Sequence, residues 1–385
     1  MNSYLIFSLI LIIAYAILML IYTYGFLKAR RVASVSRSEV QPFLSIIIPA
    51  RNESANIADC INSILNNNYP RVLFEIILVD DFSSDETASI AKEILNLEQD
   101  KVLYLKDFIS EENSINAFKK KALSIGIEHS RGDYIITTDA DCIVQEDWLQ
   151  LLANKMLSRV ENKCLGAPVN FIPANNKKNL LYYFQSLDFM TMQGITVASN
   201  ILNLGNMSNG ANFMFSKPTF VALNGYKDID HLASGDDMML MQKINNAFPG
   251  SIDFLLHTDA IVLTPTQPSW SSFFNQRVRW ASKSNSYPQF KLSLILLLVY
   301  LTNLNFLMLL LLSIFQIQYL YFLAFGLLIK VVCELIFLFP VSLFFKKIKE
   351  LIFFIFLQPV HIAYIISAGF LAKFGSYKWK GRTVK

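Results

Sequence analysis

The sequence predicts an α/β domain built on a parallel sheet, with membrane-spanning helices at both ends of the chain. Residues 5–27, and the chain from residue 292 onward, are apolar and carry few charges, and about 20 apolar residues suffice to cross a bilayer. The segment between them, from about residue 40 to residue 285, has the composition of a soluble domain. In that segment short apolar runs alternate with helical patterns, which indicates strands joined by helical crossovers.

The first apolar run, Leu5 to Leu27, indicates a retained membrane anchor over residues 1–30. A cleaved signal peptide would have a shorter apolar stretch with basic residues before it. Here the basic residues Lys28, Arg30 and Arg31 follow the run. By the positive-inside rule this cluster predicts an integral protein of the plasma or cytoplasmic membrane, with its central segment in the cytoplasm.

Composition limits the classes of partner and of metal site. The 385-residue chain has a net charge of +4, and much of the basic excess lies beside the apolar runs, which favours lipid head groups over nucleic acid. The four cysteines have neither the paired spacing of a zinc site nor the density of a disulfide framework. They suit a reducing compartment.

The central segment opens with two strand-and-helix units. A buried strand is predicted in FLSIIIPARNE, from Phe43, and an amphipathic helix in NESANIADCINSILNN, with Asn52 or Ser54 as its cap. FEIILVDDFSSDET repeats the plan, with a helix from about Glu86. In parallel sheets of this kind, ligands bind beyond the carboxyl ends of the strands.

Acidic residues follow the ends of two predicted strands. Asp80 and Asp81 end the second strand, and Asp139 and Asp141 follow the strand in GDYIITTDADC. Carboxylates on one sheet edge repel each other unless a cation or donor compensates, and oxygen ligands suit Mg²⁺ or Mn²⁺ held together with phosphates. A metal-bound nucleotide fits both strand ends. The alternatives are turn residues for the first pair and helix caps for the second.

The order of five motifs resembles the membrane-bound family 2 glycosyltransferases, whose catalytic domain has the GT-A fold, a Rossmann-like fold for nucleotide-diphospho-sugars. The resemblance covers roughly residues 43–285 and rests on SIIIPARNE, ILVDDFSSDET, KKKALSIGIEHSRGDYIITTDADC, SGDDMML and QRVRW. Each motif alone is weak, whereas five in this order are specific. The resemblance implies an α/β GT-A domain over residues 40–285 that ends in an interfacial QRVRW helix.

The same resemblance implies a site for a UDP-sugar donor. The family's acidic loop contacts the base and ribose, which implies that role for Asp80 or Asp81. Its phosphate-binding lysine aligns with Lys119 or Lys120, since a lysine supplies a mobile point charge to a diphosphate. By default, lysines 119–121 would be the solvated face of a helix.

The metal ligands and the catalytic base are also implied by the resemblance. Asp139 and Asp141 stand where the family binds its divalent cation, and Asp139 would also approach the nucleotide. Asp237 would be the general base, and Asp236 stands where the family often has glutamate. One carboxylate base without a nucleophile predicts direct displacement, which inverts the anomeric centre. Without the family, these two acids equally predict a helix N-terminus.

The acceptor side is implied by two further motifs. Gln276, Arg279 and Trp280 lie at i, i+3 and i+4, on one helical face; in the family the Trp shapes the acceptor site, and the other two contact diphosphate and acceptor. An interfacial anchor is the alternative for a Trp and an Arg beside a bilayer. NGANFMF, at 209–215, resembles the family's donor-sugar and acceptor wall, although Asn-Gly is also a turn.

The C-terminal part, residues 290–375, is predicted to hold transmembrane and interfacial helices, followed by a basic tail at 376–385. Leu292–Phe315 and Tyr319–Phe345 read as two spans. Pro359 interrupts a third apolar run at 351–374, and a third span would place the basic tail outside, so we favour a re-entrant or interfacial hairpin there.

Lys330 and Glu334 fall inside the second of these spans at i and i+4. Charges inside a membrane are costly and face protein, water or substrate. A neutralised pair within the helix bundle is favoured over the lining of an acceptor path.

The sequence therefore predicts an integral-membrane, metal-assisted, inverting glycosyltransferase that moves a sugar from a UDP-sugar to a lipid or lipid-linked acceptor. A processive polysaccharide synthase of the cellulose, chitin or hyaluronan type is the alternative, but these spans make a thin channel unless the chain forms a homo-oligomer or has an assembly partner. A non-catalytic sugar-nucleotide-binding subunit is the alternative from another class. No nucleic-acid partner is expected.

Overall fold

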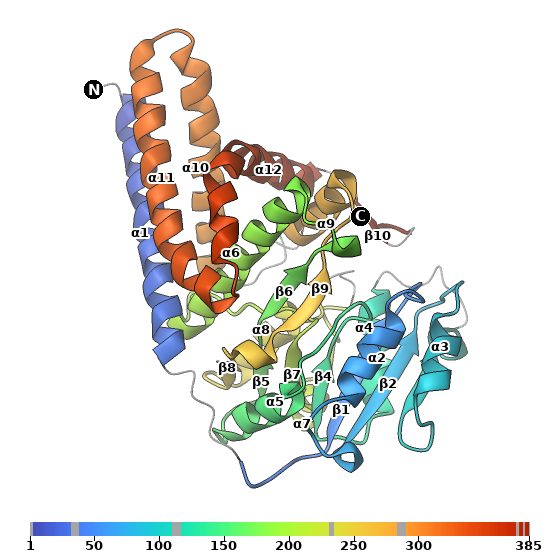
Figure 1. Cartoon of the computed structure of the whole chain (residues 1–385). Coiled ribbons are helices and arrows are strands. Elements are labelled where there is room, and N and C mark those ends of the chain that lie inside the picture. Colours follow the sequence, from blue (N-terminus) through green and yellow to red (C-terminus); the bar gives the residue numbers. More distant parts are fainter. Residues whose placement is uncertain are drawn as a thin grey trace. The chain divides into compact units, whose positions relative to one another are not determined.

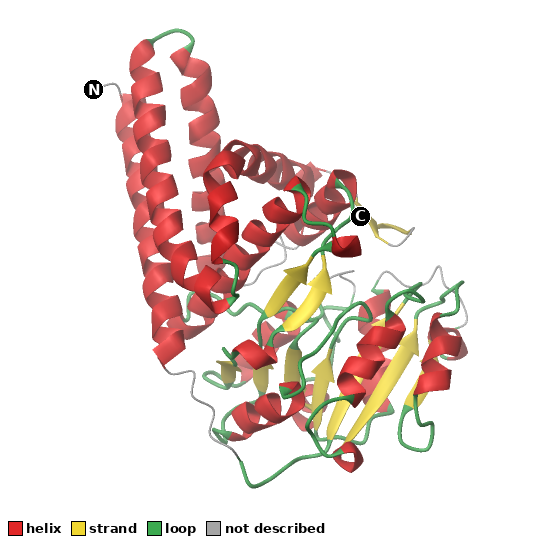
Figure 2. Cartoon of the chain, in the orientation of Figure 1, coloured by secondary structure: helices red, strands yellow, loops and turns green. Residues whose placement is uncertain are grey.

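The computed structural model describes residues 3–31, 38–109, 117–230, 235–282, 290–374, 377–379 and 382–384. The chain forms two compact units (Figure 1). Residues 1–30, 173–205 and 266–385 make up one, which we call the helical unit, and residues 31–172 and 206–265 make up the other, the sheet unit. Figure 2 shows that the strands gather in the sheet unit, apart from a short hairpin near the C-terminus.

A seven-stranded sheet forms the sheet unit, in the order β3-β2-β1-β4-β7-β5-β8. Its strands are β1 (Leu44–Ala50), β2 (Phe74–Asp80), β3 (Lys101–Tyr104), β4 (Tyr134–Thr137), β5 (Cys164–Gly166), β7 (Phe213–Ser216) and β8 (Ile252–Phe254). The predicted parallel sheet is found from β3 to β4. β7 runs antiparallel to both β4 and β5, so the sheet as a whole is mixed.

Short helices and a second small sheet complete this unit. The helices are α2 (Ile57–Leu65), α3 (Thr87–Ile94), α4 (Phe118–Glu128), α5 (Trp148–Leu157), α7 (Lys217–Ala222) and α8 (Met238–Ala247), with single-turn helices η1 (Arg71–Leu73), η2 (Leu105–Asp107) and η5 (Thr258–Ala260). β6 (Val169–Ile172) pairs in parallel with β9 (Val262–Pro265). Every residue of β2 is buried, as expected of a central parallel strand covered on both faces.

The predicted caps of α2 are wrong. Asn56 occupies the N-cap position, and its side chain makes no capping bond. Asn52 instead adopts a left-handed backbone conformation with φ of 52°, which asparagine tolerates better than most residues. Its side chain turns to the neighbouring loop, where Oδ1 accepts a hydrogen bond from the Ser84 N–H at 2.8 Å.

The helical unit contains the long apolar helices. Its elements are α1 (Ser3–Arg31), α6 (Leu180–Leu202), α9 (Trp270–Ser282), α10 (Phe290–Ser313), α11 (Ile317–Phe344) and α12 (Phe354–Phe374), with η4 (Ala174–Asn176), η7 (Ile348–Phe353), β10 (Tyr377–Trp379) and β11 (Arg382–Val384). α1, α10, α11 and residues 348–371 are long and apolar enough to cross a membrane. α6 and α9, which the sequence analysis placed in the soluble segment, group with these helices.

The apolar helices pack through one shared cluster of side chains. α1, α10 and α11 run side by side (Figure 1), and Ile12, Phe306 and Leu323 represent their three contributions to a buried apolar cluster. α6 approaches closely where glycine allows it: a Cβ on Gly194 would lie 2.8 Å from side-chain atoms of Phe337 and Val341 of α11. A substitution by alanine there would force these helices apart.

The C-terminal apolar run folds differently from the hairpin that its sequence predicts. Pro359 lies inside one continuous helix, α12, and the second half of α12 lies across the direction of α10 and α11 (Figure 1). Proline removes one backbone donor and clashes with the preceding turn, so it bends a helix without reversing the chain.

The ion pair inside the apolar helix α11 lies where the sequence predicts it. Lys330 Nζ is 2.6 Å from Glu334 Oε1 and donates to Gln358 Oε1 at 2.7 Å. Gln358 Nε2 donates to Glu334 Oε2 at 2.8 Å, and the Tyr15 hydroxyl donates to Glu334. The expected neutralised pair within the bundle is confirmed, and its partners come from α1, α11 and α12.

Candidate functional site

The acidic ends of β2 and β4 lie on one edge of the sheet, because both strands flank β1 in parallel. Asp80 is the last residue of β2, and only 5% of its surface is exposed. Its Oδ2 accepts a hydrogen bond from the Ser83 N–H at 3.2 Å. Its Oδ1 is buried without a hydrogen-bond partner in the described part of the chain. An unmatched buried acceptor suits a ligand that brings a donor, such as a nucleobase N–H.

The loop after β1 braces the loop after β2. Arg51 Nη1 donates to the Asp81 carbonyl at 2.9 Å and lies 3.8 Å from the Asp81 carboxylate. The Glu53 N–H donates to Thr87 Oγ1 at 2.8 Å, and the Ser54 N–H donates to Asp85 Oδ2 at 3.1 Å. These bonds hold the acidic loop in one shape and thereby position Asp80 and Asp81.

Asp85 gives this brace a testable pH dependence. Hydrogen bonds from Thr87 and Ser54 outweigh the opposing effect of desolvation and lower the pKa of Asp85 to about 2. The carboxylate therefore stabilises the loop at pH values above its unfolded pKa of about 3.9, and this contribution is lost as the pH falls through about 2. We expect Asp85→Asn to lower the melting temperature at pH 5 and to have little effect near pH 2.

Melting curves of the detergent-solubilised protein across this pH range measure the effect. Glu93→Gln, an exposed acid on α3, is the control and is expected to follow the parent. A constant difference between Asp85→Asn and the parent at all pH values would contradict the assigned titration.

Lys119 joins two acidic motifs that are far apart in the sequence. Its Nζ lies 2.7 Å from Asp139 Oδ1 and 3.2 Å from Asp236 Oδ2. Desolvation acts to lower the pKa of Lys119, but the carboxylates of Asp139 and Asp236 raise it overall. Lys119 therefore stays charged and holds these acids together. Lys120 points elsewhere, donating to the Ile229 carbonyl at 2.6 Å, and Lys121 is exposed.

Gly210 connects the same cluster to the predicted base. Its N–H donates to Asp237 Oδ2 at 2.8 Å, and its carbonyl accepts from Thr137 Oγ1 at 2.7 Å. A Cβ on Gly210 would lie 2.9 Å from Asp236 Oδ2 and 3.2 Å from Lys119 Nζ, so this close approach requires glycine. NGANFMF thus forms a turn and also lines the acidic cluster.

Asp237 lies at the helix N-terminus that its sequence allows. It is the N-cap of α8, and its Oδ1 accepts from the Met238 N–H at 2.6 Å. Its carboxylate is therefore held by two backbone donors, while Asp236 is the acid that pairs with Lys119. In the described chain Asp237 forms no ion pair, which leaves it the better placed of the two to accept a proton.

The Asp-x-Asp pair could hold a divalent cation. Donor atoms of Asp139, Asp141 and Cys142 all lie within 4.8 Å of one another, and α5 takes its N-cap from Asp147, so the two aspartates are not its caps. The Asp139 side chain is 40% exposed and open to a ligand. Burial raises the pKa of the Cys142 thiol, which leaves the carboxylates as the donors. Hard oxygen donors fit Mg²⁺ or Mn²⁺.

The QRVRW segment lies on α9 in the helical unit, and is helical as its spacing predicts. Gln276 and Trp280 both contact a residue that the sequence analysis did not single out, Arg277. Arg277 is buried and forms an ion pair with Asp188 of α6 at 2.8 Å. A lone aspartate within the long apolar stretch LLYYFQSLDFM was the one available signal for this pair.

Two family models match the chain. The model described as glycosyl transferase family 2 matches residues 45–208, and that described as glycosyl transferase family group 2 matches residues 134–366, which is more than half of the chain. Together they cover the acidic loops, the acidic pair before α8, and α9.

Similar proteins include a named glycosyltransferase and a polysaccharide synthase. A probable glycosyltransferase, YdaM of Bacillus subtilis, is 27% identical over 64% of this chain and 56% of its own length. A poly-beta-1,6-N-acetyl-D-glucosamine synthase of Staphylococcus epidermidis is 26% identical over 62% of this chain and 53% of its own length. The chain thus spans about half the length of these relatives.

A solved structure shares the fold. The mannosyltransferase PcManGT of Pyrobaculum calidifontis, in complex with GDP-Man and Mn²⁺, superposes with a TM-score of 0.54 at 17% identity, covering 94% of this chain and 99% of that one. This similarity supports the predicted GT-A fold.

Proposed function

The chain belongs to the family 2 glycosyltransferases, and we propose that it transfers a sugar from a UDP-sugar to a lipid or lipid-linked acceptor at a membrane, with inversion of the anomeric centre. The observation that carries this proposal is the cluster at Lys119, where Asp139 of the Asp-x-Asp pair and Asp236 of the acidic pair meet one ammonium group. Four segments distant in sequence converge there, through Lys119, Asp139, Gly210 and the pair at 236 and 237.

The donor would lie along the carboxyl edge of the sheet. Asp80 offers its unmatched Oδ1 to a nucleobase N–H, and the braced loop at Asp81 would flank the ribose. Asp139 and Asp141 would hold Mg²⁺ or Mn²⁺, which would neutralise charge on the departing diphosphate. Lys119, once released from Asp139, would supply a second positive charge to the same phosphates.

Proton removal would fall to Asp237. Attack of a hydroxyl on the anomeric carbon needs a base within hydrogen-bond reach. The two backbone donors on Asp237 fix the orientation of its carboxylate, and each oxygen retains a lone pair for the acceptor hydroxyl. Asp236 would hold Lys119 in place. With one base and no covalent nucleophile in this cluster, a single displacement inverts the configuration.

The acceptor would bind at the helical unit. Gln276, Arg279 and Trp280 lie on α9, beside helices that are apolar enough to cross a membrane, and this favours an acceptor that resides in the bilayer. The basic residues at the end of α1, Lys28, Arg30 and Arg31, support a cytoplasmic position for the sheet unit in this proposal.

A second candidate function is repeated transfer to form a polysaccharide. The relatives named poly-beta-1,6-N-acetyl-D-glucosamine synthases favour it. The four candidate spanning helices among the described residues would make a narrow export path, so this version calls for a homo-oligomer or a partner protein.

One experiment tests the donor, the metal and the product together. We expect the purified protein in lipid to release UDP from one UDP-sugar only when Mg²⁺ or Mn²⁺ is present, and Asp141→Ala to lose this release because a metal ligand is missing. The panel includes GDP-sugars, since the solved structure of similar fold contains GDP-Man. Mass spectrometry of the lipid fraction then gives product length.

A single added sugar supports transfer to a lipid, whereas a ladder supports the synthase. Release that is unaffected by chelation or by Asp141→Ala would refute the metal assignment. Asp259→Ala, at an exposed acid outside the cluster, is the matched control.

A further inference from the structure

Arg277 is the most buried charged residue of the QRVRW helix. Its side chain is 1% exposed, and it stands at one of the two positions that the Gln-x-x-Arg-Trp spacing leaves unspecified. Its guanidinium lies 4.1 Å from the ring centre of Trp280 and 4.8 Å from that of Phe273. Phe273 lies one helical turn before Arg277 and Trp280 lies one turn after it, so the guanidinium is held between two aromatic rings. Its Nη1 also donates to Gln276 Oε1 at 3.1 Å.

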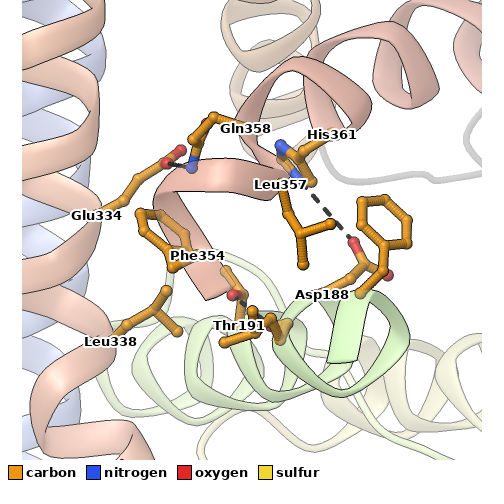
Figure 3. A pocket seen from close by; sticks show the side chains of 10 residues that line it. Asp188, Thr191, Glu334, Leu338, Phe354, Leu357, Gln358 and His361 are labelled. Carbon is orange, nitrogen blue, oxygen red and sulfur yellow. Dashed lines mark hydrogen bonds and ion pairs between the residues drawn. The ribbon is translucent and has the colours of Figure 1, made fainter. Parts of the chain in front are cut away.

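Asp188 fixes this guanidinium from α6. Its Oδ2 accepts from Arg277 Nε at 2.9 Å and lies 2.8 Å from Nη2. Its Oδ1 faces His361 Nε2 of α12 at 3.8 Å, across a pocket with a volume of about 30 Å³ (Figure 3). The carboxylate therefore contacts one edge of the guanidinium through Oδ2, and Oδ1 faces this small pocket.

Stability alone does not explain this pair. Taking two charges out of water costs free energy that their attraction only partly offsets, and apolar residues of similar volume are often as stabilising. What an ion pair with a planar partner adds is a fixed orientation. Here the oriented group contacts Trp280 and Gln276, two of the three signature residues of α9.

We propose that Arg277 and Asp188 are positioning residues, which set the orientation of Trp280 and Gln276 for acceptor binding. This inference rests on the proposed function, in which α9 presents these side chains to the acceptor. It adds a pair of residues outside the signature, one of them 89 positions upstream on α6.

The test labels the full chain in detergent with 5-fluorotryptophan. Its four tryptophans give separate ¹⁹F signals, and that of Trp280 is identified by its loss in Trp280→Phe. Arg277→Lys keeps the charge but loses the flat, two-pronged contact. The double variant Asp188→Asn/Arg277→Met removes both charges, which avoids leaving a lone buried carboxylate. We expect the Trp280 signal to shift in both variants, while the signal of Trp148 in the sheet unit stays.

Kinetics then connect orientation to function. Since small misplacements of a substrate-positioning group cost about 10²-fold, we expect kcat/KM for the acceptor to fall by about that factor in the double variant. The kcat/KM of Arg277→Lys is expected to lie between that of the double variant and that of the parent. Binding of UMP, which reports on the sheet unit, is expected to be unchanged.

The control is Lys155→Met/Asp253→Asn, which removes an ion pair of 2.8 Å in the sheet unit and is expected to leave the Trp280 signal in place. An unshifted Trp280 signal, or parental acceptor kinetics, in the double variant would overturn the proposal. Full activity in Arg277→Lys would overturn the stacking argument. A parent without transfer activity refutes the proposed function instead, and the ¹⁹F spectra still decide whether the pair orients Trp280.

Discussion

Asp237→Asn is expected to reduce the rate of sugar transfer by about 10²- to 10⁴-fold, the range that general-base catalysis supplies. An amide cannot accept the proton of the attacking hydroxyl. The parent carboxylate accepts the Gly210 N–H on Oδ2 and the Met238 N–H on Oδ1. An asparagine can satisfy one of these donors through its oxygen, whereas its NH₂ group faces the other donor.

The same substitution therefore carries a modest stability cost, which must be separated from the loss of chemistry. An unsatisfied buried donor costs about 1–3 kcal/mol, so the melting temperature is expected to fall while the protein remains folded at room temperature. UDP affinity is expected to stay near that of the parent, because the hydrogen bonds of the Asp237 carboxylate go to the backbone of Gly210 and Met238, whereas Lys119 pairs with Asp139 and Asp236. Initial rates, melting curves and calorimetric UDP titration on the same preparation measure the three effects.

Asp236→Asn is the informative comparison. Asp236 pairs with Lys119 at 3.2 Å, so its loss is expected to weaken donor binding more than Asp237→Asn does. If Asp237→Asn transfers sugar at the parental rate, Asp237 is not the base. If Asp236→Asn shows the larger loss of kcat, the roles of the two acids are exchanged.

The sheet and its acidic edge were predictable because each signal is local. Runs such as LSIIIPA and FEIILVD are apolar over a strand's length and end at a polar loop, and parallel strands bring such ends to one edge. That Asp80 and Asp139 lie at the same sheet edge could be predicted from this rule alone, without knowledge of tertiary contacts. The two-residue spacing of Asp139 and Asp141 also encodes their proximity directly.

Other parts of the site could not be predicted, because they depend on contacts with residues far away in the sequence. Lys119 and Lys120 are adjacent and alike in sequence, yet only Lys119 reaches Asp139, because helical rotation sends Lys120 to the Ile229 carbonyl. Arg277 sits between the signature positions, and its partner Asp188 is on a helix without a motif. The left-handed turn at Asn52 likewise follows from its bonds to the next loop, and not from its own capping preference.

Lys119→Met is expected to change how the protein responds to divalent metal. The Lys119 ammonium lies 2.7 Å from Asp139, where it competes with a cation for the same carboxylate. Its removal leaves Asp139 and Asp236 to repel each other in a partly buried cluster. Because Asp139 is 40% exposed, we expect a destabilisation of about 1–3 kcal/mol, below the 3–5 kcal/mol typical of a fully buried broken pair.

Added Mn²⁺ is then expected to raise the melting temperature of Lys119→Met more than that of the parent, because the ion replaces the missing positive charge without displacing a lysine. Stabilisation grows with the ratio of free ligand to dissociation constant, so a titration followed by melting gives the affinity in each protein. Transfer is nonetheless expected to fall by about 10²-fold, since loss of one group that stabilises developing charge costs about this much.

Lys121→Met is the matched control, because it removes a lysine two positions away whose side chain is exposed. It is expected to match the parent in melting temperature, metal response and rate. An equal rise in melting temperature with Mn²⁺ in all three proteins would mean that Lys119 does not compete for the metal position. A larger Mn²⁺-dependent rise in the melting temperature of Lys119→Met, together with slower transfer, would support two roles for Lys119. It would neutralise the acidic residues before the metal binds, and it would bind the donor phosphates afterwards.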